Sequence, residues 1–215
     1  MAKRENTVEA FREAARLGAD MVELDVRRTA DGALVVHHDA RVADLGPIVG
    51  LRTAELPAWL PSLHEALDAC AGMGVNIELK NSPVDPDYDP ADAAAALVGA
   101  LVVGRGDQAR VIVSSFNLDS VDVVHRAHPD IPTAFLTLPG LDQDWAMETA
   151  VDRGHVALHP HEASVTPELV TAAHALGLAV NTWTVDDPAR MRELAAAGVD
   201  GIVTNVPDIA IATLR

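Results

Sequence analysis

The stretch GADMVELDVRRTADGALVVHHDA, residues 18–40, decides the fold that the sequence predicts. It carries Glu23 and Asp25 two positions apart in an apolar run, and two histidines and a further aspartate follow. Side chains two positions apart in a β-strand point to the same face of the sheet. The stretch therefore predicts a buried strand, at residues 21–26, that directs two carboxylates to one side.

The rest of the chain alternates short apolar runs with helical patterns. Strands are expected at residues 21–26, 75–80, 110–116, 133–136, 155–159, 178–184 and 201–204, with a short extension at 34–37. Helices are expected at residues 7–17, 62–71, 90–103, 117–127, 142–153, 166–176, 187–197 and 207–214. Strands separated by helices of this length indicate right-handed βαβ units and a parallel sheet. Their repetition favours an α/β fold of the TIM (β/α)8 type.

The number of strands indicates what the barrel lacks. Seven strands are recognisable and the chain opens on a helix, so the first strand of the barrel has no counterpart. We expect a single domain over residues 1–215 that is truncated at its N-terminus. The strands at 21–26 and 201–204 would then have unpaired edges, which invite homodimerisation or aggregation.

Composition excludes several classes of function. Acidic residues outnumber basic ones 32 to 16, and a net charge of -16 argues against a nucleic-acid partner and requires a local cation for any anionic substrate. The single cysteine, Cys70, excludes a disulfide framework and a cysteine-based zinc site, and it is expected in the core. Without an apolar run of about 18 residues we expect no membrane insertion, and we predict a cytoplasmic protein.

Polar residues gather where the predicted strands end. Glu78 and Lys80 repeat the two-residue spacing of Glu23 and Asp25, and chemistry in such barrels lies at the C-terminal ends of the strands. Three carboxylates in one barrel mouth cannot all ionise unpaired. A bound cation would resolve this, and an oxygen set without cysteine suits Ca²⁺ or Mg²⁺. Structural ion pairs with the neighbouring arginines or with Lys80 are the alternative.

Two further features lie near this predicted mouth. His38 stands beside Asp39, which gives a group that titrates near neutral pH and suits acid/base chemistry. The acidic segment at residues 85–90, DPDYDP, resembles the start of a calcium loop, but Pro90 and Ala96 stand where that loop needs glycine and glutamate. We interpret the segment as an irregular loop at the pocket rim.

The segments ENTVEAFREAARLGADMVELDVRRTADGALVVHHD, LPSLHEAL, NIELK, VIVSSFN, LGLAVNTWTVDD and AGVDGIVTNVP occur in that order and together resemble the glycerophosphodiester phosphodiesterase family. The resemblance spans nearly the whole chain and implies a TIM barrel. It also implies hydrolysis of small glycerophosphodiesters to an alcohol and sn-glycerol 3-phosphate. A divalent cation, Ca²⁺ or Mg²⁺, would be held by Glu23, Asp25 and Glu78.

The resemblance also assigns roles to single residues. It implies that His38 is one of two catalytic histidines and that Lys80 lies near the substrate phosphate. Trp183 matches a tryptophan that walls the pocket, and Glu5 and Asn6 match the Glu-Asn-Thr stretch near the metal mouth.

The chain departs from the family pattern at both ends. Family members begin with a strand that ends in His-Arg-Gly, whereas only MAKR precedes Glu5, and Thr204-Asn205 stands where Thr-Asp is usual. The resemblance implies that the histidine of His-Arg-Gly is the first of the two catalytic histidines, and it has no match in this chain. Loss of one acid/base group typically costs about 10²–10⁴-fold in rate, so we expect impaired activity. The alternatives are a non-catalytic barrel that binds a cation or a phosphodiester, and a relative resembling a lysophospholipase D.

Overall fold

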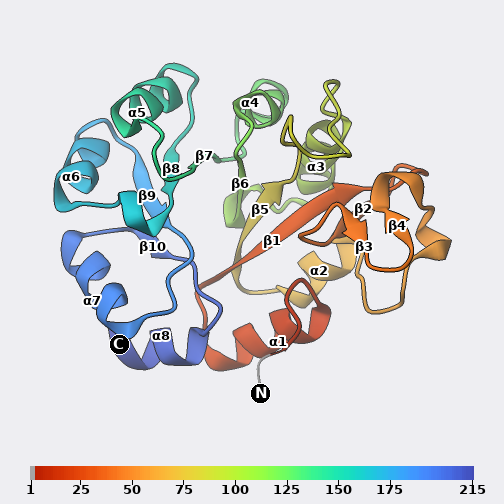
Figure 1. Cartoon of the computed structure of the whole chain (residues 1–215), viewed down its shortest axis with the longest axis horizontal. Coiled ribbons are helices and arrows are strands. Elements are labelled where there is room, and N and C mark those ends of the chain that lie inside the picture. Colours follow the sequence, from red (N-terminus) through yellow and green to blue (C-terminus); the bar gives the residue numbers. More distant parts are fainter. Residues whose placement is uncertain (1–2) are drawn as a thin grey trace. The chain divides into compact units, whose positions relative to one another are not determined.

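The structure, a computed structural model, describes residues 3–215 of the chain (Figure 1). The chain divides into two compact units, Met1–Ile131 and Pro132–Arg215. Each unit consists of strands joined by helices.

The first unit begins with a helix and builds a four-stranded sheet. Its strands follow the order β2-β1-β5-β6, in which β1, β5 and β6 run parallel and β2 runs antiparallel to β1. Its elements are α1 (Val8–Leu17), β1 (Met21–Arg28), β2 (Leu34–Val36), β3 (Arg41–Val42), β4 (Gly46–Pro47), the 3₁₀ turns η1 (Ile48–Gly50) and η2 (Thr53–Glu55), α2 (Leu63–Ala69), β5 (Gly74–Leu79), α3 (Ala93–Arg105), η3 (Gln108–Arg110), β6 (Val111–Ser115) and α4 (Leu118–Ala127).

Alternation along β1 gives this sheet an apolar face and a polar face. Leu24 and Val26 are fully buried and belong to one core cluster with side chains of the four helices α1–α4. Because successive side chains of a strand point to opposite faces, Glu23 and Asp25 lie on the face away from that cluster. The apolar face fixes the sheet on its helices, which leaves the other face for the polar side chains.

Local signals in the sequence set the ends of the helices around this sheet. Thr7 caps α1 by accepting a hydrogen bond from the backbone N–H of Ala10, and Gly18 ends it in the left-handed conformation at φ 90°. The α2 helix begins with a capping box, in which the side chains of Ser62 and Glu65 each accept a hydrogen bond from the backbone N–H of the other. The cap of α1 brings the preceding residues, 4–6, beside β1.

The outer edge of β1 is partly closed. The predicted extension at residues 34–37 forms β2, in which Val36 pairs with Val26, so the predicted unpaired edge is wrong at the end of this strand. The backbone N–H of His37 also bonds the carbonyl of Asp25, and over residues 21–24 the strand pairing within the described part of the chain lies on the β5 side alone. Homodimerisation through that edge stays a prediction.

The second unit is a run of parallel strands with helical crossovers. Its strands follow the order β7-β8-β9-β10. Its elements are β7 (Thr133–Thr137), α5 (Gln143–Asp152), β8 (Ala157–Pro160), η4 (Glu162–Ser164), α6 (Pro167–Ala175), β9 (Ala179–Thr182), α7 (Pro188–Ala197), β10 (Gly201–Ile202) and α8 (Pro207–Leu214). With the three parallel strands of the first unit, the described residues contain the seven that the sequence predicts.

The last strand is shorter than expected. The predicted strand at 201–204 is reduced to β10, because the carboxylate of Asp186 accepts hydrogen bonds from the hydroxyl of Thr204 and from the backbone and side-chain amides of Asn205. With these hydrogen bonds, residues 204–205 bind the Asp186 side chain instead of continuing the strand.

Two predictions from composition can be compared with the structure. Cys70 is buried as expected, and burial raises the pKa of its thiol to about 12, which keeps it unreactive. No helix among residues 3–215 is long and apolar enough to cross a lipid bilayer. The cytoplasmic location stays a prediction.

Candidate active site

Three carboxylates converge on the polar face of the first unit's sheet. Glu23 and Asp25 come from β1 and Glu78 comes from β5, and the parallel register places Asp25 directly opposite Glu78. One carboxylate oxygen from each residue lies within 4.8 Å of the others. The sequence predicted that these three acids share one mouth, and the structure brings them together.

Asn6 holds one of these acids in place. Its side-chain Nδ2 donates to Asp25 Oδ2 at 2.8 Å, and its Oδ1 accepts from the backbone N–H of Asp25 at 3.1 Å. Asn6 adopts a left-handed backbone conformation, with φ 54°, just before the capping residue Thr7. The Glu-Asn-Thr stretch therefore lies against the acidic cluster, as the family resemblance implies.

Lys80 forms ion pairs with two of the three acids. Its Nζ lies 2.8 Å from Glu78 Oε1 and 3.2 Å from Asp25 Oδ1. Burial works against the charge on Lys80, but the two carboxylates outweigh that cost and raise its pKa. The structural ion pairs that we considered as an alternative are thus present at Lys80, whereas Arg27 and Arg28 pair with other aspartates.

Glu23 remains without such compensation. Its Oε1 is buried and has no hydrogen-bond partner among the described residues. Burial raises the pKa of Glu23 well above its usual value, and repulsion from Asp25 and Glu78 adds to the effect. Burial likewise raises the pKa of Glu78, against the opposing charge of Lys80. An orphaned oxygen beside two other carboxylates fits a hard divalent cation, which takes all-oxygen ligand sets.

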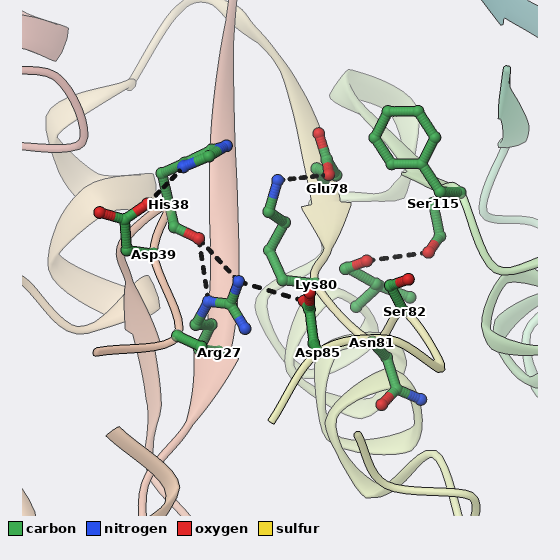
Figure 2. Close-up of a pocket in the computed structure, with 12 residues that line it drawn as sticks. Arg27, His38, Asp39, Glu78, Lys80, Asn81, Ser82, Asp85 and Ser115 are labelled. Carbon is green, nitrogen blue, oxygen red and sulfur yellow. Dashed lines mark hydrogen bonds and ion pairs between the residues drawn. The ribbon is translucent and has the colours of Figure 1, made fainter. Parts of the chain in front are cut away.

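A cavity of about 320 Å³ opens beside these acids (Figure 2). Glu78 and Lys80 line it from the end of β5, Ser115 from the end of β6, and His38 from the segment after β2. The loop after β5, which includes the predicted rim segment 85–90, contributes Asp85.

His38 is the histidine of this cavity. Its Nδ1 lies 2.9 Å from Asp39 Oδ1, and this hydrogen bond lowers the pKa of Asp39. The neighbouring His37 is half-buried against Trp59, with ring centroids 5.8 Å apart, and burial lowers its pKa. The two adjacent histidines thus have different surroundings, and only His38 lines the cavity.

Trp183 belongs to the second unit. Its indole Nε1 donates to the backbone carbonyl of His159 at 2.8 Å, and its ring meets His161 edge to face at 5.0 Å between centroids. These contacts fix the indole at the C-terminal end of β9, which is the end where the sequence placed it. Its predicted role in walling the substrate pocket stays a prediction.

The sequence did not identify every residue of the cavity. Arg27 continues the alternation of Glu23 and Asp25 along β1 and lines the cavity, although we considered it only as an ion-pair partner of the acids. The alternation of side chains along β1 could have identified Arg27 as a residue of the cavity. Its acidic partners lie in the loop after β5, which has no periodicity from which they could be inferred.

Comparisons with known proteins agree with this geometry. The model of the glycerophosphoryl diester phosphodiesterase family matches residues 1–209. A glycerophosphodiester phosphodiesterase of Caldanaerobacter subterraneus subsp. tengcongensis is 33% identical over 232 residues, covering 98% of this chain and 92% of the relative. The chain therefore belongs to the glycerophosphoryl diester phosphodiesterase family, a class of phosphoric diester hydrolases.

Solved structures support the fold assignment. A glycerophosphodiester phosphodiesterase from Parabacteroides distasonis has a TM-score of 0.84 and 28% identity, and covers 98% of this chain and 92% of that one. An Oleispira antarctica phosphodiesterase in complex with the product sn-glycerol-3-phosphate has a TM-score of 0.85, with 98% and 91% covered. Its identity of 23% supports the fold alone. The predicted TIM-barrel fold class is confirmed, since the structural neighbours are enzymes of that fold.

Proposed function

We propose that this chain hydrolyses glycerophosphodiesters to an alcohol and sn-glycerol 3-phosphate, in a reaction that depends on a divalent cation. The observation that carries the proposal is the convergence of three carboxylate oxygens within 4.8 Å beside a cavity of about 320 Å³. Membership of the family supplies the substrate class. The structural neighbour from Oleispira antarctica was solved with sn-glycerol-3-phosphate as its product.

Glu23, Asp25 and Glu78 would hold the cation, and Ca²⁺ and Mg²⁺ both take carboxylate oxygens. When bound, the cation would neutralise charge on a phosphoryl oxygen and so stabilise the transition state. The buried, unpartnered oxygen of Glu23 supports this assignment, because a carboxylate buried without a partner is costly unless a cation compensates it.

His38 would transfer a proton at the reacting oxygens. When Nδ1–H donates to Asp39, the lone pair of Nε2 is left to take a proton from the attacking group or, once protonated, to give one to the leaving alkoxide. Lys80 follows β5 directly and lines the same cavity, where its ammonium group would hold the substrate phosphate. Trp183 would wall the pocket, as the family resemblance implies.

We further propose that turnover is impaired. His38 is the only histidine among the described residues that line the cavity, whereas the proposed reaction uses one group to accept a proton and another to donate one. Loss of one acid/base group typically costs about 10²–10⁴-fold. The expected result is slow but metal-dependent hydrolysis.

The test measures release of sn-glycerol 3-phosphate from glycerophosphocholine in Ca²⁺, in Mg²⁺ and in EDTA, with calorimetry of cation binding on the same samples. We expect binding and slow turnover in the wild type, and loss of both in Glu78→Gln. Glu148→Gln, an exposed change on α5, is the matched control that keeps both. Binding without turnover would favour a non-catalytic barrel, and absence of cation binding would overturn the proposal.

A further inference from the structure

Arg27 is a buried cation with an unusual set of partners. It lies on β1 two positions after Asp25, and 3% of its side chain is exposed. Its Nε and Nη2 both donate to the backbone carbonyl of His38, at 2.9 and 2.8 Å. Its Nη1 contacts both carboxylate oxygens of Asp87, at 2.8 and 2.7 Å, and its Nη2 donates to Asp85 at 3.3 Å.

These partners belong to two different walls of the cavity. Figure 2 shows Arg27 between the main chain of His38 on one side and Asp85 on the other. His38 follows β2, whereas the aspartates lie in the loop that joins β5 to α3. The planar guanidinium therefore connects the two walls through fixed hydrogen-bond directions, which a lysine ammonium does not offer.

We propose that Arg27 is a positioning residue, which sets the place of His38 relative to the loop wall and so orients the imidazole toward the substrate. The proposal rests on the role that we have proposed for His38. Hydrogen bonds to the carbonyl of a residue restrain its main chain, and the position of the main chain determines where the side chain starts.

The exposure of the His38 side chain explains why its main chain needs such support. The side chain is 55% exposed, and its hydrogen-bond partner Asp39 is 73% exposed. Such a pair is weakly ordered by itself, because exposed ion pairs contribute little. The buried contacts of Arg27, with Asp87 only 6% exposed, are therefore the rigid part of this assembly.

The neighbouring arginine offers a matched control. Arg28 pairs with Asp89 of the same loop at 3.4 Å, but it points to the other face of the sheet, away from the carbonyl of His38 that Arg27 binds. The loop has a further anchor in Asn81, whose side chain bonds the backbone N–H and carbonyl of Asp89. Loss of Arg28 therefore removes one anchor of the loop and leaves the His38 carbonyl bound.

The experiment compares Arg27→Gln, Arg27→Lys and Arg28→Gln in the full chain. The first readout is the imidazole Cε1–H resonance of His38 by NMR, assigned with His38→Gln and recorded without substrate. The second is the separation of kcat from KM with glycerophosphocholine. We expect Arg27→Gln to shift or broaden the resonance and to lower kcat about 10–100-fold with KM nearly unchanged, because small misplacements of a catalytic group cost that much.

Arg27→Lys should restore the wild-type His38 resonance and kcat only in part. Arg28→Gln should leave the resonance and kcat as in the wild type. An unchanged His38 resonance in folded Arg27→Gln, or an equal change in Arg28→Gln, would overturn the proposal. Should Arg27→Gln not fold, Asp87→Asn takes its place and is expected to perturb the same resonance. Absence of wild-type turnover would refute the proposed function alone, since the resonance reports on Arg27 independently.

Discussion

Glu23 is the residue at which the proposed cation site can be tested through stability. Its carboxylate is buried, lacks a hydrogen-bond partner at Oε1 and lies within 4.8 Å of two other acids. Glutamine has nearly the same shape and no charge. We expect Glu23→Gln to be more stable than the wild type at neutral pH when cations are chelated, which is the opposite of what substitution of a well-satisfied buried group does.

The size of this difference in unfolding free energy follows from the distance between the carboxylates and from proton linkage. At 4.8 Å two unit charges repel by about 3 kcal/mol at an effective dielectric constant of ~20. The folded-state pKa of Glu23 is raised above 4.5, so its contribution to stability is complete below about pH 4.5 and is lost as pH rises through the folded pKa. Between the unfolded-state pKa and the folded-state pKa, the free energy of unfolding falls by about 1.4 kcal/mol per pH unit. The advantage of Glu23→Gln should therefore be near zero at about pH 4.5 and should grow as pH rises, towards the ~3 kcal/mol of the repulsion.

Urea unfolding in EDTA between about pH 4.5 and 8 measures this difference, with Glu148→Gln as the exposed control. Ca²⁺ at about 1,000 times Kd should reverse the order, because it stabilises the wild type by about 4.1 kcal/mol and the variant far less. A difference between variant and wild type that stays constant with pH would refute the assigned burial and repulsion. So would a variant that is less stable than the wild type at neutral pH.

Three further predictions follow from the same contacts. Lys80→Met leaves Asp25 and Glu78 without their cation and should cost about 3–5 kcal/mol by urea unfolding in EDTA at neutral pH; a loss near zero would contradict the pairing. His38→Gln should lower kcat by about 10²–10⁴-fold with little change in melting temperature, because the side chain is mostly exposed. Light scattering should show a homodimer through the edge of β1; a monomer at all concentrations would exclude it.

Much of the fold could be predicted because it depends on local patterns. Alternating strands and helices, the capping box at Ser62 and Glu65 and the glycine at 18 are each encoded within a few residues. Two features were not predicted. The β3–β4 ribbon has strands of two residues each, which are too short for any periodicity, and β10 ends early because of a side chain from a different segment, Asp186.

The candidate site was predictable to the extent that it follows strand alternation. Glu23 and Asp25 share a face by spacing alone, and Glu78 meets them because parallel neighbours bring the same ends of their strands together. The partners of Arg27 could not be found in this way. Asp87 lies 60 residues further along in an irregular loop, and its position depends on tertiary packing rather than on any repeat.

The charges around the cavity support the proposal that an anionic substrate needs a cation at this site. Lys80 is already shared between Asp25 and Glu78, and Arg27 is already matched by two aspartates of the loop. Both basic residues are therefore already engaged by carboxylates, while Glu23 adds a carboxylate whose Oε1 has no hydrogen-bond partner among the described residues. A phosphate entering this site would meet net negative charge in a chain whose overall charge is -16. A divalent cation bound at the acidic cluster would offset this local negative charge, and it would also release Lys80 from part of its attraction to the acids.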